Sequence, residues 1–164
     1  MAIRFGILTA SDRSARGERQ DQTTPALEEL IKTQEWHVVR VAVVPDDLQA
    51  IKDTLTSWVD RRDLDVILTT GGTGFSPRDN TPEATLAVVE RLVPGMAEAM
   101  RINSMQITPH AMLSRGVAGI CRNVLIINLP GSPKAAIENF KVVQSVLAHA
   151  VELLKNDPES EKHH

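Results

Sequence analysis

Two aspartates and one glycine-rich run are the residues of this 164-residue chain with the clearest chemistry. Asp46 and Asp79 lie on loops that follow β-rich segments, and two carboxylates facing a polyphosphate suit Mg²⁺, which prefers hard oxygen ligands. The run Gly71-Gly72-Thr73-Gly74 lacks a Cβ at three of its four positions, so its backbone can approach a ligand closely. Together these residues predict a phosphate cradle beside a magnesium site.

Each of these residues also has a purely structural interpretation. Asp46 is placed to cap the helix that follows it, and Asp79 to solvate a turn beside Arg78. The glycine run has neither the Lys-Ser/Thr pair of a P-loop nor the GxGxxG spacing, so by itself it fits a flexible turn as well as a phosphate site. Both interpretations stay open for each residue taken alone.

Further polar residues lie on or near the same loops. Arginine and lysine side chains bind phosphate, and guanidinium groups do so bidentately, although an isolated one is equally well an exposed, solvated charge. These candidates are Ser11, Asp12, Arg13, Arg78, Ser114, Arg115 and Lys134, together with the Pro130-Gly131-Ser132 turn. The histidines have no metal-ligand spacing.

Apolar β-rich segments alternate along the chain with segments of helical period. Strands are expected at residues 3–9, 36–44, 65–70 and 124–129, with an additional strand at 117–121. Helices are expected at 24–33, at 48–59 with Asp46 as cap, from Thr81 as cap, at 95–105, and from Ser132 to about residue 154. This alternation predicts an α/β fold with a mostly parallel sheet and helices on both faces. Ligands of such sheets bind beyond the carboxyl ends of the strands, where the candidate loops lie.

Composition limits the classes of protein to consider. The net charge of −3 and the pI near 5.9 disfavour a nucleic-acid binder, which usually carries a basic face. No apolar run approaches the roughly 18 residues of a membrane span, and a single cysteine, Cys121, cannot form an intrachain disulfide. The first residues lack the features of a signal peptide, so we expect a cytoplasmic protein. We expect one domain over residues 1–155 and a polar, disordered tail over 156–164.

Five segments, in order along the chain, resemble the molybdopterin adenylyltransferase family, which includes the bacterial MogA type and the G domains of plant and animal gephyrin-like proteins. The longest is TTGGTGFSPRDNTPEAT, residues 69–85. The others are TASDR at 9–13, VPDD at 44–47, MLSR at 112–115 and NLPGSPK at 128–134. The resemblance spans nearly the whole chain, which makes it far more specific than the glycine run alone.

The resemblance implies a three-layer α/β/α sandwich, a homotrimer, and transfer of AMP from ATP to the phosphate of molybdopterin in molybdenum-cofactor biosynthesis. It implies Mg²⁺ as cofactor, small-molecule substrates, and a molybdenum-insertion protein as the partner that receives the product. Asp46 and Asp79 match the family's functional aspartates and would be both catalytic and metal-binding. Gly71, Gly72, Thr73, Gly74, Pro130, Gly131 and Ser132 would contact the nucleotide, while Ser11, Asp12, Arg13, Arg78, Ser114 and Arg115 would contact substrate, chiefly on the pterin side.

Three alternatives must be weighed against this assignment. The MoaB type has the same fold, and some of its members do not adenylylate; in some of those the segment matching residues 77–82 has drifted. Here that segment is intact, except that Asn80 stands where valine is frequent. A nucleotide hydrolase could use the same cradle, and a non-catalytic trimer could bind a pterin or a partner, although the intact aspartate pair disfavours the latter.

Overall fold

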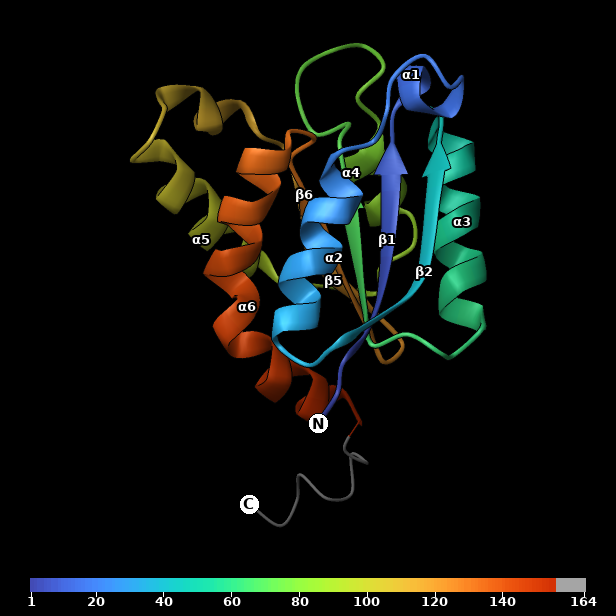
Figure 1. Cartoon of the computed structure of the whole chain (residues 1–164), viewed down its shortest axis with the longest axis vertical. Helices are drawn as coiled ribbons and strands as arrows, with labels where there is room; N and C mark the ends of the chain where they lie inside the picture. Colours follow the sequence, from blue (N-terminus) through green and yellow to red (C-terminus); the bar gives the residue numbers. More distant parts are fainter. Residues whose placement is uncertain (156–164) are drawn as a thin grey trace.

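A single mixed sheet forms the centre of the protein, in a computed structural model that describes residues 1–155 (Figure 1). The strand order is β2-β1-β3-β6-β5-β4. Four strands run parallel: β1 (Arg4–Ala10), β2 (His37–Val44), β3 (Val66–Thr70) and β6 (Val124–Leu129). Antiparallel pairing then adds β5 (Ala118–Cys121) to β6 and β4 (Arg91–Leu92) to β5. The predicted α/β class with a mostly parallel sheet is confirmed; the tail expected at 156–164 lies outside the described residues.

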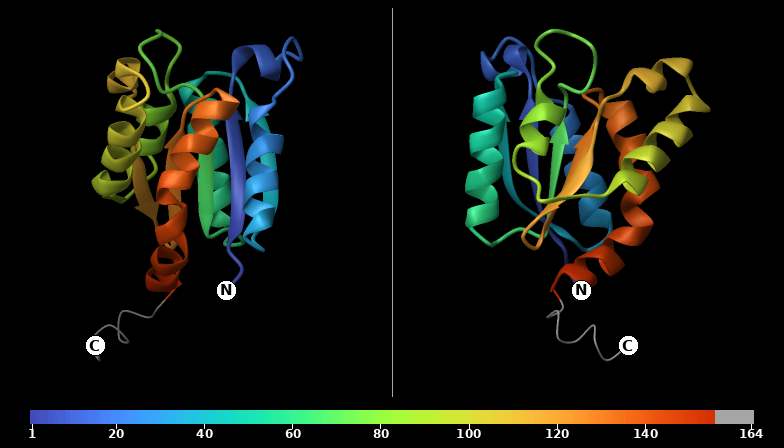
Figure 2. Two further views of the ribbon diagram at one scale, coloured as in Figure 1. Left: turned by 60° about the vertical axis from the view of Figure 1, so that its left-hand side comes forward. Right: turned by 180° about the vertical axis from the view of Figure 1, so that it is seen from behind.

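Helices cover both faces of this sheet. One face carries α2 (Thr23–Thr33), α5 (Pro94–Met105) and α6 (Pro133–Lys155), and the other carries α3 (Leu48–Asp60) and α4 (Thr81–Leu86), as Figure 2 shows from two sides. Strand residues alternate between the two cores: Phe5 packs under the first layer of helices and Leu8 under the second. The fold is therefore a three-layer α/β/α sandwich. None of the helices within residues 1–155 is long and apolar enough to cross a membrane.

Three short elements were not expected from the sequence: β4, the one-turn helix α1 (Asp12–Ala15) and the 3₁₀ helix η1 (Pro109–Leu113). Each is too short to show a hydrophobic period, which is why the pattern did not predict it. The bounds of the expected strands and helices otherwise agree to within one or two residues.

Two expected helix caps are wrong, and both corrections bear on function. Asp47, not Asp46, caps α3, because its carboxylate accepts a hydrogen bond from the Ala50 N–H at 2.8 Å. Asn80, not Thr81, occupies the cap position of α4, and its side chain makes no capping hydrogen bond. The carboxylate of Asp46 therefore does not cap a helix, and the Thr81 hydroxyl is buried without a hydrogen-bond partner.

The carboxyl ends of the four parallel strands meet at one edge of the sheet, at the top of Figure 1. The loops that follow Ala10, Val44, Thr70 and Leu129 therefore converge there, although they are far apart in the sequence. This edge carries the candidate site.

Candidate active site

The glycine-rich run leaves β3 in a conformation that requires glycine. Gly71 and Gly72 have φ angles of 85° and 69°, in the left-handed region that side chains with a Cβ rarely adopt. A Cβ on Gly71 would lie 2.5 Å from the Ala10 carbonyl oxygen, and the Gly71 N–H donates to the Leu129 carbonyl at 3.2 Å. The run is therefore wedged between the ends of β1 and β6, which fixes its position and presents its other side to solvent.

The carboxylates of Asp46 and Asp79 lie against this glycine run. A Cβ on Gly72 would come 3.3 Å from Asp46 Oδ1, and a Cβ on Gly74 would come 2.9 Å from Asp79 Oδ2. Both aspartates line one polar cavity of about 370 Å³ together with Gly71 and Gly72. The structure thus brings the two carboxylates to the cradle, as their positions after β2 and β3 predicted.

The carboxylate of Asp46 is electrostatically unfavourable as it stands. Partial burial raises its pKa, and the nearby charges of Asp12 and Asp79 raise it further, against opposing effects of the Asp12 N–H and Arg78. A cation in the cavity would relieve both causes, since it would replace lost hydration and offset the repulsion. The site therefore favours a positively charged ligand.

The donor set fits Mg²⁺ bound together with a phosphate ligand. Within residues 1–155 no three His, Cys, Asp or Glu side chains are grouped so as to hold a metal ion by themselves. Magnesium sites commonly consist of one or two carboxylates completed by water and substrate phosphates, which is what Asp46 and Asp79 beside a glycine cradle can offer. A metal here would depend on the substrate for its remaining ligands.

Two helix N-termini point toward the same cavity. Thr23, at the start of α2, and Pro133, at the start of α6, both line it. Ser132 caps the 23-residue helix α6 by accepting from the Ala135 N–H at 3.2 Å, and a Cβ on Gly131 would lie 3.2 Å from Gly71 Cα. Helix N-termini favour anions, so this end of the cavity suits phosphate. Of the predicted Pro130-Gly131-Ser132 turn, Gly131 and Ser132 line this cavity, whereas Pro130 does not.

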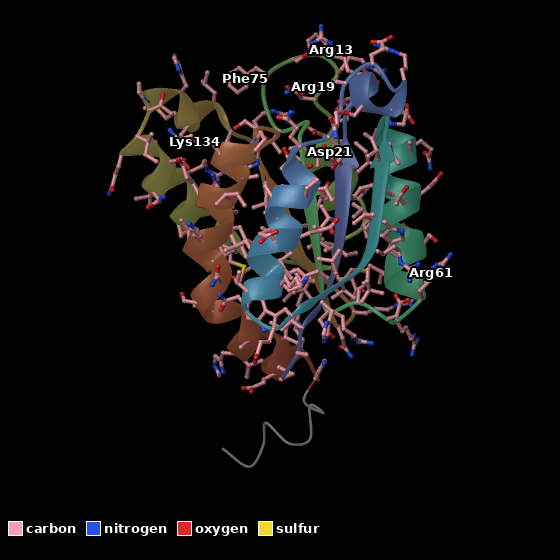
Figure 3. All side chains as sticks on the ribbon, viewed as in Figure 1. Arg13, Arg19, Asp21, Arg61, Phe75 and Lys134 are labelled. Carbon is pink, nitrogen blue, oxygen red and sulfur yellow. The ribbon has the colours of Figure 1, made fainter. Side chains whose placement is uncertain are left out.

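Asp12, on the segment after β1, supports Asp46 and does not itself line the polar cavity. The N–H of Asp12 donates to Asp46 Oδ2, and the Asp46 N–H donates to Asp12 Oδ1, each at 3.0 Å. Arg78 binds Asp12 bidentately at 2.8 and 3.1 Å. Ser11 lines the polar cavity and caps α1. Arg13, labelled in Figure 3, is exposed and does not line that cavity.

Several residues that line the polar cavity were not predicted from the sequence, among them Arg19, Asp21 and Thr23. Figure 3 shows Arg19 and Asp21 on the segment between α1 and α2. Burial opposes ionisation of Asp21, but hydrogen bonds from Thr24, Thr9 and Thr23 outweigh it and lower its pKa. The Thr23 hydroxyl donates to the Gly131 carbonyl at 2.8 Å. An aspartate two residues before a helix is a capping signal that could have identified Asp21.

A second cavity, of about 330 Å³, lies on the other side of the glycine run. Its lining is largely apolar and includes Met100, Ile107 and Leu113, and it is bordered by Thr73 and Gly74. Ser114 lines this cavity, whereas Ser11 lines the polar one. Of the six residues expected to contact substrate, chiefly on the pterin side, only these two line one of the two cavities; the linings do not include Asp12, Arg13, Arg78 and Arg115.

Arg115 is turned toward the protein rather than toward open space. Its Nε donates to the Gly74 carbonyl and its Nη2 to the Asp79 carbonyl, both at 2.8 Å, while Nη1 pairs with Glu83. Close by, Asn128 is buried and donates to Thr69 and Thr85. Arg115 is thus hydrogen-bonded to the glycine-rich loop through its side chain and, by its backbone N–H, to the Thr73 carbonyl.

Comparison with known proteins identifies relatives across nearly the whole chain. The family model described as "Probable molybdopterin binding domain" matches residues 6–149. The molybdenum cofactor synthesis protein cinnamon of Drosophila melanogaster is 45% identical over 95% of this chain, although the chain spans only 26% of its length. A molybdopterin adenylyltransferase of Helicobacter pylori is 39% identical, covering 93% of this chain and 88% of the relative. The crystal structure of the molybdopterin biosynthesis enzyme MoaB of Thermus thermophilus superposes with a TM-score of 0.89 at 51% identity, covering 95% and 98% of the two chains.

Proposed function

Since this chain belongs to the molybdopterin-binding domain family, we propose that it is a molybdopterin adenylyltransferase, which transfers AMP from ATP to the phosphate of molybdopterin and releases pyrophosphate. One observation carries the proposal: the carboxylates of Asp46 and Asp79 both lie against the glycine run, in a cavity that two helix N-termini also line. Carboxylates for a divalent cation and N–H groups for phosphate are what a reaction between two anions needs.

The reaction is an in-line displacement at phosphorus. An oxygen of the molybdopterin phosphate attacks the α-phosphorus of ATP, a new P–O bond forms, and the bond to the β-phosphate oxygen breaks. The attacking phosphate is ionised near pH 7, because its second pKa is about 6, so no side chain needs to remove a proton. The protein contributes positioning and neutralisation of charge, as in phosphoryl transfer generally.

Each part of the cradle has a share in that positioning. Gly71, Gly72 and Gly74 let the phosphates approach the backbone, Thr73 adds a hydroxyl, and the N-terminus of α6 at Ser132 faces the chain of phosphates. Asp46 and Asp79 would hold Mg²⁺, which when bound shields the phosphate oxygens from one another. The adjoining apolar cavity would take a planar ring system of a substrate, beside Ser114.

We extend the proposal to the setting of the reaction. The protein acts in the cytoplasm as a homotrimer and passes adenylylated molybdopterin to a molybdenum-insertion protein. Light scattering should give three times the chain mass of 18.0 kDa, and a stable monomer at micromolar concentration would refute the trimer.

A mixing experiment tests the activity. Purified protein is incubated with Mg²⁺ and ATP labelled in its α-phosphate, with and without molybdopterin. The label is followed into adenylylated molybdopterin and free AMP, and pyrophosphate is measured separately. Label in adenylylated molybdopterin only when molybdopterin is present supports the transferase. Release of AMP without molybdopterin would instead identify a hydrolase, and no reaction in either mixture would identify a non-catalytic binding protein.

A further inference from the structure

The segment that carries Asp79 rises as an uncovered loop between β3 and α4 (Figure 1). Its tip is exposed: the Phe75 side chain is 69% accessible, and it packs into neither core (labelled in Figure 3). Within the loop, the Ser76 N–H donates to Asp79 Oδ2 and the Asp79 N–H donates to the Ser76 carbonyl, both at 2.9 Å. These local bonds shape the turn. Its Asp79 end is also tied toward Asp46, because Arg78 binds Asp12 and the Asn80 side-chain amide donates to the Asp46 carbonyl at 3.4 Å. Neither of these contacts holds the Gly74 end of the loop.

One residue from a distant segment ties both ends of this loop to the protein. Arg115 donates from Nε to the Gly74 carbonyl and from Nη2 to the Asp79 carbonyl, at 2.8 Å each. Its backbone N–H donates to the Thr73 carbonyl at 2.8 Å, and its third nitrogen pairs with Glu83 on α4. A planar guanidinium can serve several fixed acceptors at once, whereas the single ammonium of lysine cannot reproduce that fork.

We propose that Arg115 is the positioning residue of Asp79, holding the loop from Gly74 to Asp79 so that the Asp79 carboxylate faces Asp46 across the glycine run. This inference rests on the proposed function only for its catalytic consequence. The family resemblance implied that Arg115 contacts substrate. The positioning role differs from that contact, because each of the three guanidinium nitrogens of Arg115 already has a protein partner.

We call the hydrogen bonds from Arg115 to the Gly74 and Asp79 carbonyls the clamp. Because the clamp uses the carbonyl of Asp79, Arg115 binds neither oxygen of the Asp79 carboxylate. Loss of the clamp should therefore weaken metal binding without removing a metal ligand. Partners that orient a metal ligand are worth about 10- to 100-fold in metal affinity or activity, which sets the expected effect. Binding of ATP through the glycine run and the N-terminus of α6 should change much less.

The test compares Arg115→Gln and Arg115→Lys with a matched control, Arg122→Gln. Arg122 is an arginine at the opposite end of the sheet whose ion pair with Asp60 is exposed. In adenylyl transfer at fixed ATP and molybdopterin, both Arg115 variants should need about 10- to 100-fold more Mg²⁺ for half-maximal rate, with the KM for ATP nearly unchanged. The control should behave as wild type. An unchanged Mg²⁺ requirement in Arg115→Gln would overturn the proposal.

A double-mutant cycle with Asp79→Asn separates positioning from an independent role. If Arg115 acts through Asp79, Arg115→Gln should cost nothing further once the Asp79 carboxylate is gone, whereas independent effects would multiply. A multiplied loss would show that Arg115 contacts substrate, and would overturn the inference.

Amide hydrogen exchange gives a readout that does not need turnover. In Arg115→Gln the amides of residues 74–79 should exchange faster than in wild type, while those of β3 should not. Unchanged exchange in the loop would overturn the clamp even if the enzyme is active. A wild-type protein that transfers no AMP would refute the proposed function, and hydrogen exchange would still decide the clamp.

Discussion

Asp12 and Asp46 are joined by two reciprocal hydrogen bonds, in which the backbone N–H of each residue donates to the side chain of the other at 3.0 Å. The two residues are 34 positions apart and lie just beyond the ends of the adjacent strands β1 and β2, so this pair fastens the segment after β1 to the loop after β2. Arg78 binds the outer side of Asp12 and lowers its pKa, which keeps Asp12 ionised. Asp46 is thereby held in one orientation with Oδ1 toward the glycine run.

Replacing Asp46 should separate activity from stability. Asp46→Asn keeps an oxygen that can accept from the Asp12 N–H, but it removes a charge that burial, Asp12 and Asp79 all disfavour. We expect adenylyl transfer to fall at least about 100-fold, since even the partners of metal ligands are worth about 10- to 100-fold. The metal-free variant should melt at a higher temperature than wild type, as is common when a functional charge is removed. Calorimetry in EDTA, beside the transfer assay, tests both; a lower melting temperature would contradict the electrostatic argument.

Acidification should weaken the proposed binding of Mg²⁺ at Asp46. Because its pKa is raised in the folded protein, Asp46 takes up a proton at a higher pH than an ordinary aspartate does. The half-saturating Mg²⁺ concentration should therefore rise as pH falls through this raised pKa. In the metal-free protein the folded state holds this proton more tightly, so the contribution to stability is present at acid pH and is lost as pH rises through the folded pKa. The stability advantage of Asp46→Asn should accordingly disappear in acid, and an advantage independent of pH would point to another cause.

Asp79→Asn tests the second carboxylate separately. The asparagine oxygen can still accept from the Ser76 N–H, so the turn should persist and the free energy of unfolding should change by less than about 0.5 kcal/mol, as for most surface substitutions that remove no structural contact. Transfer should fall at least about 100-fold with molybdopterin still bound. Equilibrium binding of molybdopterin, measured beside turnover, distinguishes the roles: lost binding with retained ATP hydrolysis would assign Asp79 to the pterin rather than to the metal.

How far the sequence predicted this site depends on the range of the interactions involved. Asp46, Asp79 and the glycine run could be identified because each lies on a loop that follows a strand of a parallel sheet, and parallel strands end at one edge. The cap of α3 was assigned one residue too early because Asp46 and Asp47 are both good capping residues, and only the backbone geometry separates them.

The supporting residues could not be predicted in the same way. Arg115 reaches the Gly74 carbonyl across 41 positions and Asp12 reaches Asp46 across 34, and in both pairs one partner is a backbone atom. Backbone atoms are the same at every residue, so no sequence pattern marks them as acceptors or donors. The division of the site into a polar and an apolar cavity likewise depends on where α5 and η1 pack, which their weak periodicity did not reveal.

Asp65 should stabilise the opposite end of the sheet. It is buried, and although burial disfavours its charge, hydrogen bonds from Arg4 and the charge of Lys155 outweigh this and lower its pKa. Asp65→Asn should therefore cost about 1.5–3 kcal/mol at pH 7, the range for hydrogen bonds to charged groups. Because the folded pKa is lowered, this stability is present above the unfolded pKa and is lost as pH falls through the folded one. Urea unfolding against pH measures it, with the exposed Asp60→Asn as control, which should cost less than about 1 kcal/mol.

Gly72→Ala should damage both the fold and the site, for reasons that two other glycines can separate. An alanine at position 72 would have to adopt the left-handed backbone conformation of Gly72. Its Cβ would collide with the buried Thr81 hydroxyl and would lie 3.3 Å from Asp46 Oδ1. Gly17→Ala has the same left-handed strain with nothing within 4 Å, and should cost only about 1–2 kcal/mol. Gly95→Ala has neither problem and should be neutral or stabilising by up to about 1 kcal/mol, since it lies in α5. We expect Gly72→Ala to lose more stability than Gly17→Ala and, alone of the three, to lose adenylyl transfer. Equal losses of stability at positions 72 and 17, with transfer intact, would mean that Thr81 and Asp46 move aside and that the close approach of the backbone at Gly72 is not needed by the phosphates.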